Sequence, residues 1–289
     1  MSVYNVQGDV AAKIYNSSGA LVSSAYDVSG NRVYTGNTDY DHYTITDYIN
    51  LSVGNAQGFD IYNGYIFQLI SGDKMNVYNV ETASAVATNV FIESDHGDSA
   101  SFSNDFYSAS DEFPLIYVTA DTNPAKIYIN QVTTSSSVLI RTLSFSIDQA
   151  GYYAAAAVDF DNQVLYMVGY TEQAYLSDND GSNKVLISKW DLSNLTDNGN
   201  GTFTPSYISS ATRDFIYCMQ GQQYHDGLIW IASGYTNHAG YIYAVDPSDG
   251  NIAHTVNLNT SYEVEGLAWV GNDMIVNYQG KNYQKVVFG

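Results

Sequence analysis

The stretch Tyr217–Leu258 reads YCMQGQQYHDGLIWIASGYTNHAGYIYAVDPSDGNIAHTVNL. It contains four short runs rich in β-branched and aromatic residues, and each run ends at Gly, Asp or Asn. Such runs are typical of strands, and the residues between them are typical of tight turns. The stretch therefore predicts a meander of four antiparallel strands.

The opening of this meander recurs along the chain. In three places a Gln or Glu followed by Gly lies nine positions before an apolar residue of the next strand. These pairs are Gln57 and Ile66, Gln220 and Ile229, and Glu265 and Met274. Self-similarity of this kind is the signature of a repeat protein. Two less regular copies open near His96 and Tyr152; in the latter we expect a strand at 184–192 and a loop at 194–204.

The fifth unit, residues 265–289, has room for three strands rather than four, while a strand-like run at 43–53 belongs to no unit. Rings of four-stranded blades close without leaving exposed edges. We therefore predict an all-β fold, in which residues 37–289 form a five-bladed β-propeller closed by the N-terminal strand. Six blades, one of them built from residues 1–36, is the alternative. A β-helix fits less well, because its coils are about half the length of these units.

Residues 1–36 carry a shorter β-repeat. Tyrosines recur every eleven positions, at Tyr4, Tyr15 and Tyr26, and each is followed by a glycine four residues later. Three such short units cannot bury a core of their own. We expect this segment to serve in attachment or oligomerisation, by packing on the main domain, on another copy or on a partner.

The overall composition excludes several function classes. The 289 residues carry a net charge of -20, so this acidic protein would repel a phosphate backbone and no nucleic-acid partner is expected. No apolar run approaches the ~20 residues that span a bilayer, so we expect no membrane insertion, and the N-terminus has no signal-peptide pattern. The single cysteine, Cys218, lies in an apolar run and is expected to be a buried, unreactive thiol.

The first strand of each propeller blade lines the central channel. Gln57, Gln220 and Glu265 should therefore converge, with Ala156 at the matching position of the third unit, and the adjacent glycines would let the backbones crowd together. These side chains could satisfy backbone groups or waters in a polar channel. The alternative is that they belong to a ligand site with aromatic walls. The candidates for that site are Gln57, His96, Tyr152, Tyr153, Gln220, His225, Trp230, Glu265 and Trp269.

An enzymatic function would require a specific set of catalytic side chains. Glycoside hydrolysis uses two facing carboxylates, and Asp98 is the candidate partner of Glu265. Strand alternation is expected to turn Glu263 and Asp60 away from the channel. The chain has no Gly-x-Ser-x-Gly motif, and its five histidines are scattered. Residues 178–183 match part of a calcium loop but lack its first and last acidic ligands. We therefore expect no cofactor, with a structural Ca²⁺ as the alternative.

The Gln-Gly openings, LIWIASG, GYIYAVD and VEGL resemble the blade pattern of five-bladed glutaminyl cyclases. That resemblance covers about two blades and implies a glutamate near the channel, for which Glu265 is the candidate.

The same order of motifs, together with HGDSASF, DEFPLIYV and the eleven-residue repeats, resembles tail-associated propeller proteins of gut phages and prophages over nearly the whole chain. This resemblance implies a viral receptor-binding protein that binds a cell-surface glycan. It also implies other tail proteins as partners, a homo-trimer, and a location on the virion or outside the cell after lysis. We expect such a host-adhesion module, which recognises surface carbohydrate. The alternatives are a cyclase-like or glycosidase enzyme that uses Glu265, and a structural tail scaffold.

Overall fold

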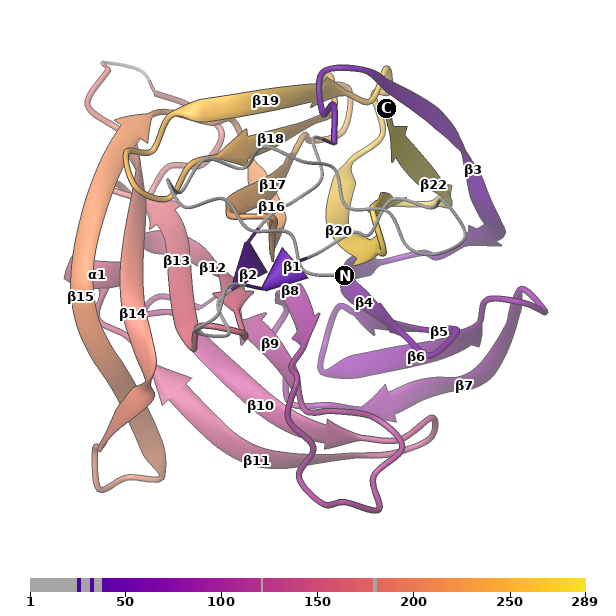
Figure 1. Cartoon of the computed structure of the whole chain (residues 1–289), viewed down its shortest axis with the longest axis horizontal. Coiled ribbons are helices and arrows are strands. Elements are labelled where there is room, and N and C mark those ends of the chain that lie inside the picture. The colour runs from indigo at the N-terminus through magenta and orange to yellow at the C-terminus, as the bar shows by residue number, and fades with distance from the viewer. Residues whose placement is uncertain (1–24, 27–31, 34–37, 121, 179–180) are drawn as a thin grey trace.

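A computed structural model describes residues 25–26, 32–33, 38–120, 122–178 and 181–289 (Figure 1). Within these residues the main chain forms three four-stranded sheets, one eight-stranded sheet and a two-stranded hairpin. In the described part of the chain, helix is confined to one short element, α1 (Ile147–Ala150). No described helix is long and apolar enough to cross a membrane.

Two of the four-stranded sheets are simple antiparallel meanders. The first consists of β4 (Ala56–Tyr62), β5 (Tyr65–Ile70), β6 (Lys74–Asn79) and β7 (Ser84–Phe91). The second consists of β16 (Met219–His225), β17 (Leu228–Ser233), β18 (Tyr241–Val245) and β19 (Ile252–Asn257). The second is the meander predicted from the stretch Tyr217–Leu258, and that prediction is confirmed.

The eight-stranded sheet joins two further meanders. One consists of β8 (Gly97–Phe102), β9 (Ile116–Ala120), β10 (Lys126–Val132) and β11 (Ser137–Ser144). The other consists of β12 (Tyr152–Asp159), β13 (Val164–Tyr170), β14 (Lys184–Asp197) and β15 (Thr202–Asp214). They are linked where Thr142 and Leu143 of β11 pair in parallel with Thr202 and Phe203 of β15. The link depends on the length of β14 and β15, which extend past the other strands of their meander (Figure 1).

The third four-stranded sheet contains strands from both ends of the described chain. It consists of β20 (Val264–Val270), β21 (Asp273–Tyr278), β22 (Lys281–Phe288) and β3 (Tyr43–Ser52). β3 pairs antiparallel with β22, and Ile45 lies opposite Val286. The backbone contacts continue past the strands, because Gly289 N donates to His42 O at 2.9 Å. The run expected as a strand at 43–53 therefore completes the sheet of the short last unit.

The prediction of a loop at 194–204 is wrong. β14 continues to Asp197 and β15 begins at Thr202, so only a tight turn remains between them. The strand was hidden because 202–214 is rich in Ser and Thr and contains Pro205, a residue that strands tolerate at edges and irregular positions. Pro205 lies opposite Leu195, next to an irregularity in the register of the two strands.

The five strands β4, β8, β12, β16 and β20 contact one another at the centre of the described ring (Figure 1). The apolar core is divided into clusters that lie between neighbouring sheets. One such cluster joins Trp230 of β17 and Val256 of β19 to Met274 of β21. Each sheet therefore buries both faces, which explains why its middle strands are apolar on both sides.

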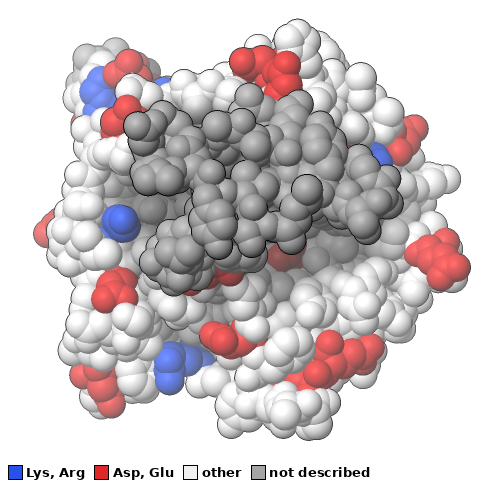
Figure 2. Space-filling view, in the orientation of Figure 1, with Lys and Arg blue, Asp and Glu red and all other residues white. Residues whose placement is uncertain are grey.

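The N-terminal repeat segment lies mostly outside the described residues. Its described part is β1 (Ala25–Tyr26), which pairs antiparallel with β2 (Arg32–Val33). Figure 2 shows acidic side chains scattered over the outer part of one face, with few basic ones among them, as the net charge of -20 leads one to expect.

Candidate functional site

Each of the five central strands has a β-bulge or register shift directly after its first paired residue. The shifts occur at equivalent places and include Gln57, Asp98, Tyr153, Gln220 and Glu265. A bulge breaks strand alternation and re-aims the side chain that it carries, which is why bulges are common beside binding sites. Five side chains, two of them glutamines, therefore lie at equivalent positions at the end where the central strands begin.

Ala156 was expected to match Gln57 in the third unit, and this is wrong. Ala156 lies in regular pairing with Met167, and Tyr153 holds the equivalent position. The hairpin between β12 and β13 has one more strand pair and a longer turn than its counterpart between β4 and β5. A count of nine residues back from β13 therefore stops short of the bulge.

The glycines beside these bulges allow the central backbones to touch. A Cβ added to Gly58 would lie 2.6 Å from Asp98 O, and one added to Gly221 would lie 2.6 Å from Gly266 Cα. Both separations are far shorter than ordinary van der Waals contact. The crowding expected of these glycines is thus present, and it holds Gln57, Gln220 and Glu265 close to one another.

A cavity of about 270 Å³ lies at this end of the central strands. The residues that line it are His96, Asp98, Tyr153, Tyr175, Cys218, Met219, Gln220, Tyr235 and Glu263. We call it the entrance pocket. It brings together four residues singled out from the sequence, namely His96, Asp98, Tyr153 and Gln220.

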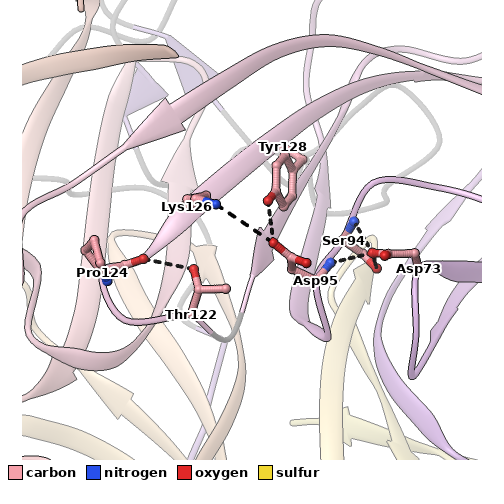
Figure 3. Close-up of polar contacts among 7 residues, drawn as sticks. All are labelled: Asp73, Ser94, Asp95, Thr122, Pro124, Lys126 and Tyr128. Carbon is pink, nitrogen blue, oxygen red and sulfur yellow. Dashed lines mark hydrogen bonds and ion pairs between the residues drawn. The ribbon is translucent and has the colours of Figure 1, made fainter. Parts of the chain in front are cut away.

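A network of polar contacts fixes the loop that leads into β8 (Figure 3). The Asp73 carboxylate accepts hydrogen bonds from the backbone N–H of Ser94 at 3.1 Å and of Asp95 at 2.6 Å. The Tyr128 hydroxyl donates to the Asp95 carboxylate at 2.6 Å, and Lys126 Nζ lies 4.0 Å from it. The loop is therefore tied to both β5–β6 and β10.

This fixed loop presents His96 and Asp98 to the entrance pocket. His96 has a positive φ of 69°, a left-handed conformation that non-glycine residues seldom adopt without surrounding support. Its Nε2 lies 4.0 Å from the Asp98 carboxylate. The Asp98 side chain is 14% exposed and that of His96 is 46% exposed, so the histidine forms the outer edge of the pocket and the aspartate lies deeper.

Three carboxyl groups gather at the entrance pocket: Asp98 and Glu263 line it, and Glu265 lies near them without lining it. Glu265 is 3% exposed, and burial, together with Glu263 and Asp98, raises the pKa of its carboxyl to about 9. Burial also raises the pKa of Glu263, whose carboxylate accepts from Gln220 Nε2 at 3.4 Å and from Thr236 Oγ1 at 3.2 Å. Glu265 therefore carries a proton at neutral pH, and the site has one protonated acid among other carboxyl groups.

Tyrosines and the cysteine form the remaining wall. The rings of Tyr153 and Tyr175 meet edge to face, with centroids 5.0 Å apart. The Tyr175 carbonyl accepts from the backbone N–H of Cys218 at 2.8 Å, which ties the loop after β13 to the start of β16. Burial, together with the nearby carboxylates, raises the pKa of the Cys218 thiol to about 12. The expectation that this thiol is buried is confirmed, and its raised pKa agrees with the expected low reactivity.

No family model and no curated protein matches the sequence. Among solved structures, glutaminyl cyclase of Myxococcus xanthus is similar with a TM-score of 0.51 and 12% identity, over 85% of this chain and 96% of that one. A glucose dehydrogenase-type oxidoreductase from Thermus thermophilus has a TM-score of 0.48 and 9% identity, over 85% of this chain and 100% of that one. The fold is that of a β-propeller. At this identity the similarity to the cyclase shows the fold alone.

Three of the candidate residues lie at the opposite end of the propeller. His225 ends β16 and lines a second cavity, of about 320 Å³, with Asp159 and Asp226. Trp230 is fully buried between sheets, and its Nε1 donates to the His225 carbonyl at 3.2 Å. Trp269 packs against both. The structure therefore separates this aromatic group from His96 and Gln220, because the two sets lie at opposite ends of the central strands.

Gln57 and Tyr152 are near the entrance pocket without lining it. The Gln57 carbonyl accepts from Gln68 Nε2 at 2.7 Å and from Asn277 Nδ2 at 2.8 Å. These amides of β5 and β21, rather than the side chain of Gln57, satisfy the backbone at the centre of the propeller. Tyr152 pairs with Tyr170 as the first residue of β12.

Sequence reasoning missed Tyr175, Tyr235 and Glu263. The two tyrosines lie in loops after β13 and β17, where no periodicity marks a residue. The expectation that Glu263 turns away from the channel is wrong. It precedes Val264, the first paired residue of β20, so strand alternation does not apply to it.

Proposed function

We propose that this propeller is a non-catalytic binding module that recognises carbohydrate in the entrance pocket. The observation that supports this proposal is the combination of lining groups: three tyrosines, Tyr153, Tyr175 and Tyr235, face one cavity together with carboxylates and an amide. Tyrosine rings offer flat apolar surface with a polar tip, and carboxylate and amide oxygens accept the hydrogen bonds of hydroxyl groups. A sugar ring presents both kinds of surface.

The volume of the entrance pocket limits the size of the ligand that can bind in it. Its volume of about 270 Å³ lies just below the ~300–1,000 Å³ that is usual for small-molecule sites. It therefore suits one terminal sugar residue rather than a long segment of a polysaccharide. Recognition of a chain end is compatible with adhesion to a glycan on a cell surface.

Two finer features belong to the same proposal. We propose that the ring has five blades, with β3 completing the last one, a count supported by the five equivalent bulges and by the pairing of β3 with β22. We also propose that residues 1–36 attach the propeller to a phage-tail-like assembly. The support for this attachment is the resemblance of the sequence motifs and the eleven-residue repeat.

A glycan array with purified protein tests the binding proposal. Binding of one or more surface glycans is expected, and it should weaken about tenfold or more in Tyr153→Ala, which removes one wall of the pocket. Tyr107→Ala is the matched control, because Tyr107 is 60% exposed in the loop after β8, at the other end of that strand. Absence of binding above background, or equal binding by the Tyr153 variant, would contradict the proposal.

An enzyme is the second candidate, and the state of Glu265 favours it. A carboxyl group that keeps its proton up to a pKa of about 9 can act as a general acid at neutral pH. Because the fold is similar to that of the Myxococcus xanthus glutaminyl cyclase, cyclisation of an N-terminal glutaminyl peptide is the first reaction to assay. Turnover that falls at least a hundredfold in Glu265→Gln would support this candidate. Turnover that persists undiminished in the variant would remove Glu265 from it.

A further inference from the structure

We infer that the sugar bound in the entrance pocket carries a free, positively charged amino group. This inference rests on the proposed function, because it names the class of carbohydrate that the same site would take.

The first argument is the charge of the lining. The carboxyl groups of Asp98 and Glu263 border the cavity, and Glu265, which is protonated at neutral pH, lies near them without lining the cavity. None of the described residues that line the cavity is Lys or Arg. Among these described residues the one basic group is His96, which lies at the outer edge and is 46% exposed. A cation forms a stronger hydrogen bond with a carboxylate than a neutral hydroxyl does.

The second argument is the environment of Glu265. Its side chain is 3% exposed, and its carboxyl has no hydrogen-bond partner among the described residues. Polar groups this deeply buried are usually hydrogen-bonded. The Glu265 oxygens are not among the fully buried side-chain atoms that lack a partner, so they keep some contact with solvent. A ligand donor would supply the absent partner. An ammonium group has three N–H donors and no acceptor, so it can serve several carboxyl groups at once.

The third argument is the aromatic wall. Tyr153 and Tyr175 pack edge to face at 5.0 Å, and Tyr235 also lines the cavity. The face of an aromatic ring attracts a cation within about 6 Å of its centroid. Tyrosines that line the same cavity as carboxylates can therefore accommodate a positive charge, while the apolar part of the ligand packs on the rings. Acetylation of the amine would remove the charge and two of its donors.

The test compares β-1,4-linked glucosamine tetramers with the fully N-acetylated tetramers and with the corresponding glucose tetramers. Affinities are measured by calorimetry at mildly acidic pH, where the amine is protonated. We expect the free-amine tetramer to bind about tenfold tighter than the N-acetylated one. In Glu263→Gln, which keeps an amide in place of the carboxylate, this preference should shrink at least threefold. Glu81→Gln, in the exposed turn after β6, is the matched control and should keep the preference.

Equal or tighter binding of the N-acetylated or glucose tetramer would overturn the inference and leave the carbohydrate proposal standing. A preference that persists unchanged in Glu263→Gln would overturn the role assigned to the pocket carboxylates. If none of the tetramers binds and the glycan array is also blank, both the inference and the proposed function fail.

Discussion

The imidazole of His225 lies flat on the indole of Trp269, with ring centroids 3.8 Å apart and planes 9° from parallel. The stack joins the end of β16 to the end of β20 and therefore connects two neighbouring sheets. Trp230 meets the same indole at 5.1 Å, and Tyr40 packs edge-on against Trp230 at 4.9 Å. These aromatics hold the sheets together at the end of the propeller opposite the entrance pocket.

Replacement of Trp269 by Ala should lower the free energy of unfolding by about 3 kcal/mol, because it leaves a void in this aromatic cluster. Ligand binding in the entrance pocket should be unchanged. Trp269→Phe is the control and should cost much less, since the buried Trp269 Nε1 has no hydrogen-bond partner among the described residues. Chemical denaturation and the glycan assay together check this. A large loss of binding by a stably folded Trp269→Ala protein would place the ligand elsewhere.

Gly58→Ala should destabilise the protein by about 1–3 kcal/mol or more, because the added Cβ would lie 2.6 Å from Asp98 O, a backbone atom that cannot move freely. The shift of Asp98 should also weaken ligand binding. Gly54→Ala is the matched control, since no atom lies within 4 Å of its added Cβ, and it should change stability by less than about 0.5 kcal/mol. Equal melting temperatures for the two variants would show that the central strands are not packed as described.

Asp60 connects two central strands. Its carboxyl accepts hydrogen bonds from the backbone N–H of Ile61 and of Phe102, each at 2.7 Å. Asp60→Ala leaves both donors without this acceptor and should cost about 1–3 kcal/mol for each one that stays buried. Asp60→Asn keeps one acceptor oxygen and should cost less. Urea denaturation of the two variants distinguishes them, and an Ala variant as stable as the Asn variant would contradict the bridging role.

The pH dependence of the free energy of unfolding should reflect the titration of the Glu265 carboxyl. Its pKa in the folded protein is about 9, against an ordinary 4.5, so the folded state holds the proton more tightly than the unfolded state does. The stabilisation is therefore complete below about pH 4.5 and is lost as the pH rises through 9. Burial raises the pKa of Asp60 to about 7. Asp60 therefore also stabilises the protein at low pH, and its contribution is lost over a lower pH range than that of Glu265.

Melting temperatures measured between pH 7 and 9 isolate Glu265, because the contribution of Asp60 ends near pH 7. The unmodified protein should lose stability across this interval. Glu265→Gln, whose side chain stays neutral, should lose clearly less. If both proteins show the same slope, Glu265 is not the group that keeps its proton.

The fold was largely predictable because the propeller repeats a local pattern. Strands such as β17 alternate apolar and aromatic residues between turns that contain Gly or Asn, so their positions follow from local chemistry. The start of β15 could not be predicted in this way, because the strand is polar and contains Pro205. Its pairing with β14 and β11 depends on tertiary contacts that no local pattern encodes.

The site was predictable only in part. Gln57, Gln220 and Glu265 could be recognised because each is followed by a glycine and lies nine positions before an apolar residue of the next strand. Asp98 and Tyr153 occupy the same bulge position without that glycine, and Tyr153 has a positive φ of 51° that its sequence context does not suggest. Tyr175 and Tyr235 enter the pocket from loops, and loop length and composition do not reveal where such side chains point.

The pairing of β3 with β22 has a consequence for biosynthesis. β3 leaves the ribosome before every other strand of the ring, and β22 leaves after them, more than two hundred residues later. At the ~5–20 residues per second of translation, β3 waits roughly ten seconds or longer for its neighbour. During that interval its hydrogen-bonding edge is available to other nascent chains. The final annealing step therefore follows translation of the last strand, and a stalled or prematurely terminated chain would be left open and prone to self-association.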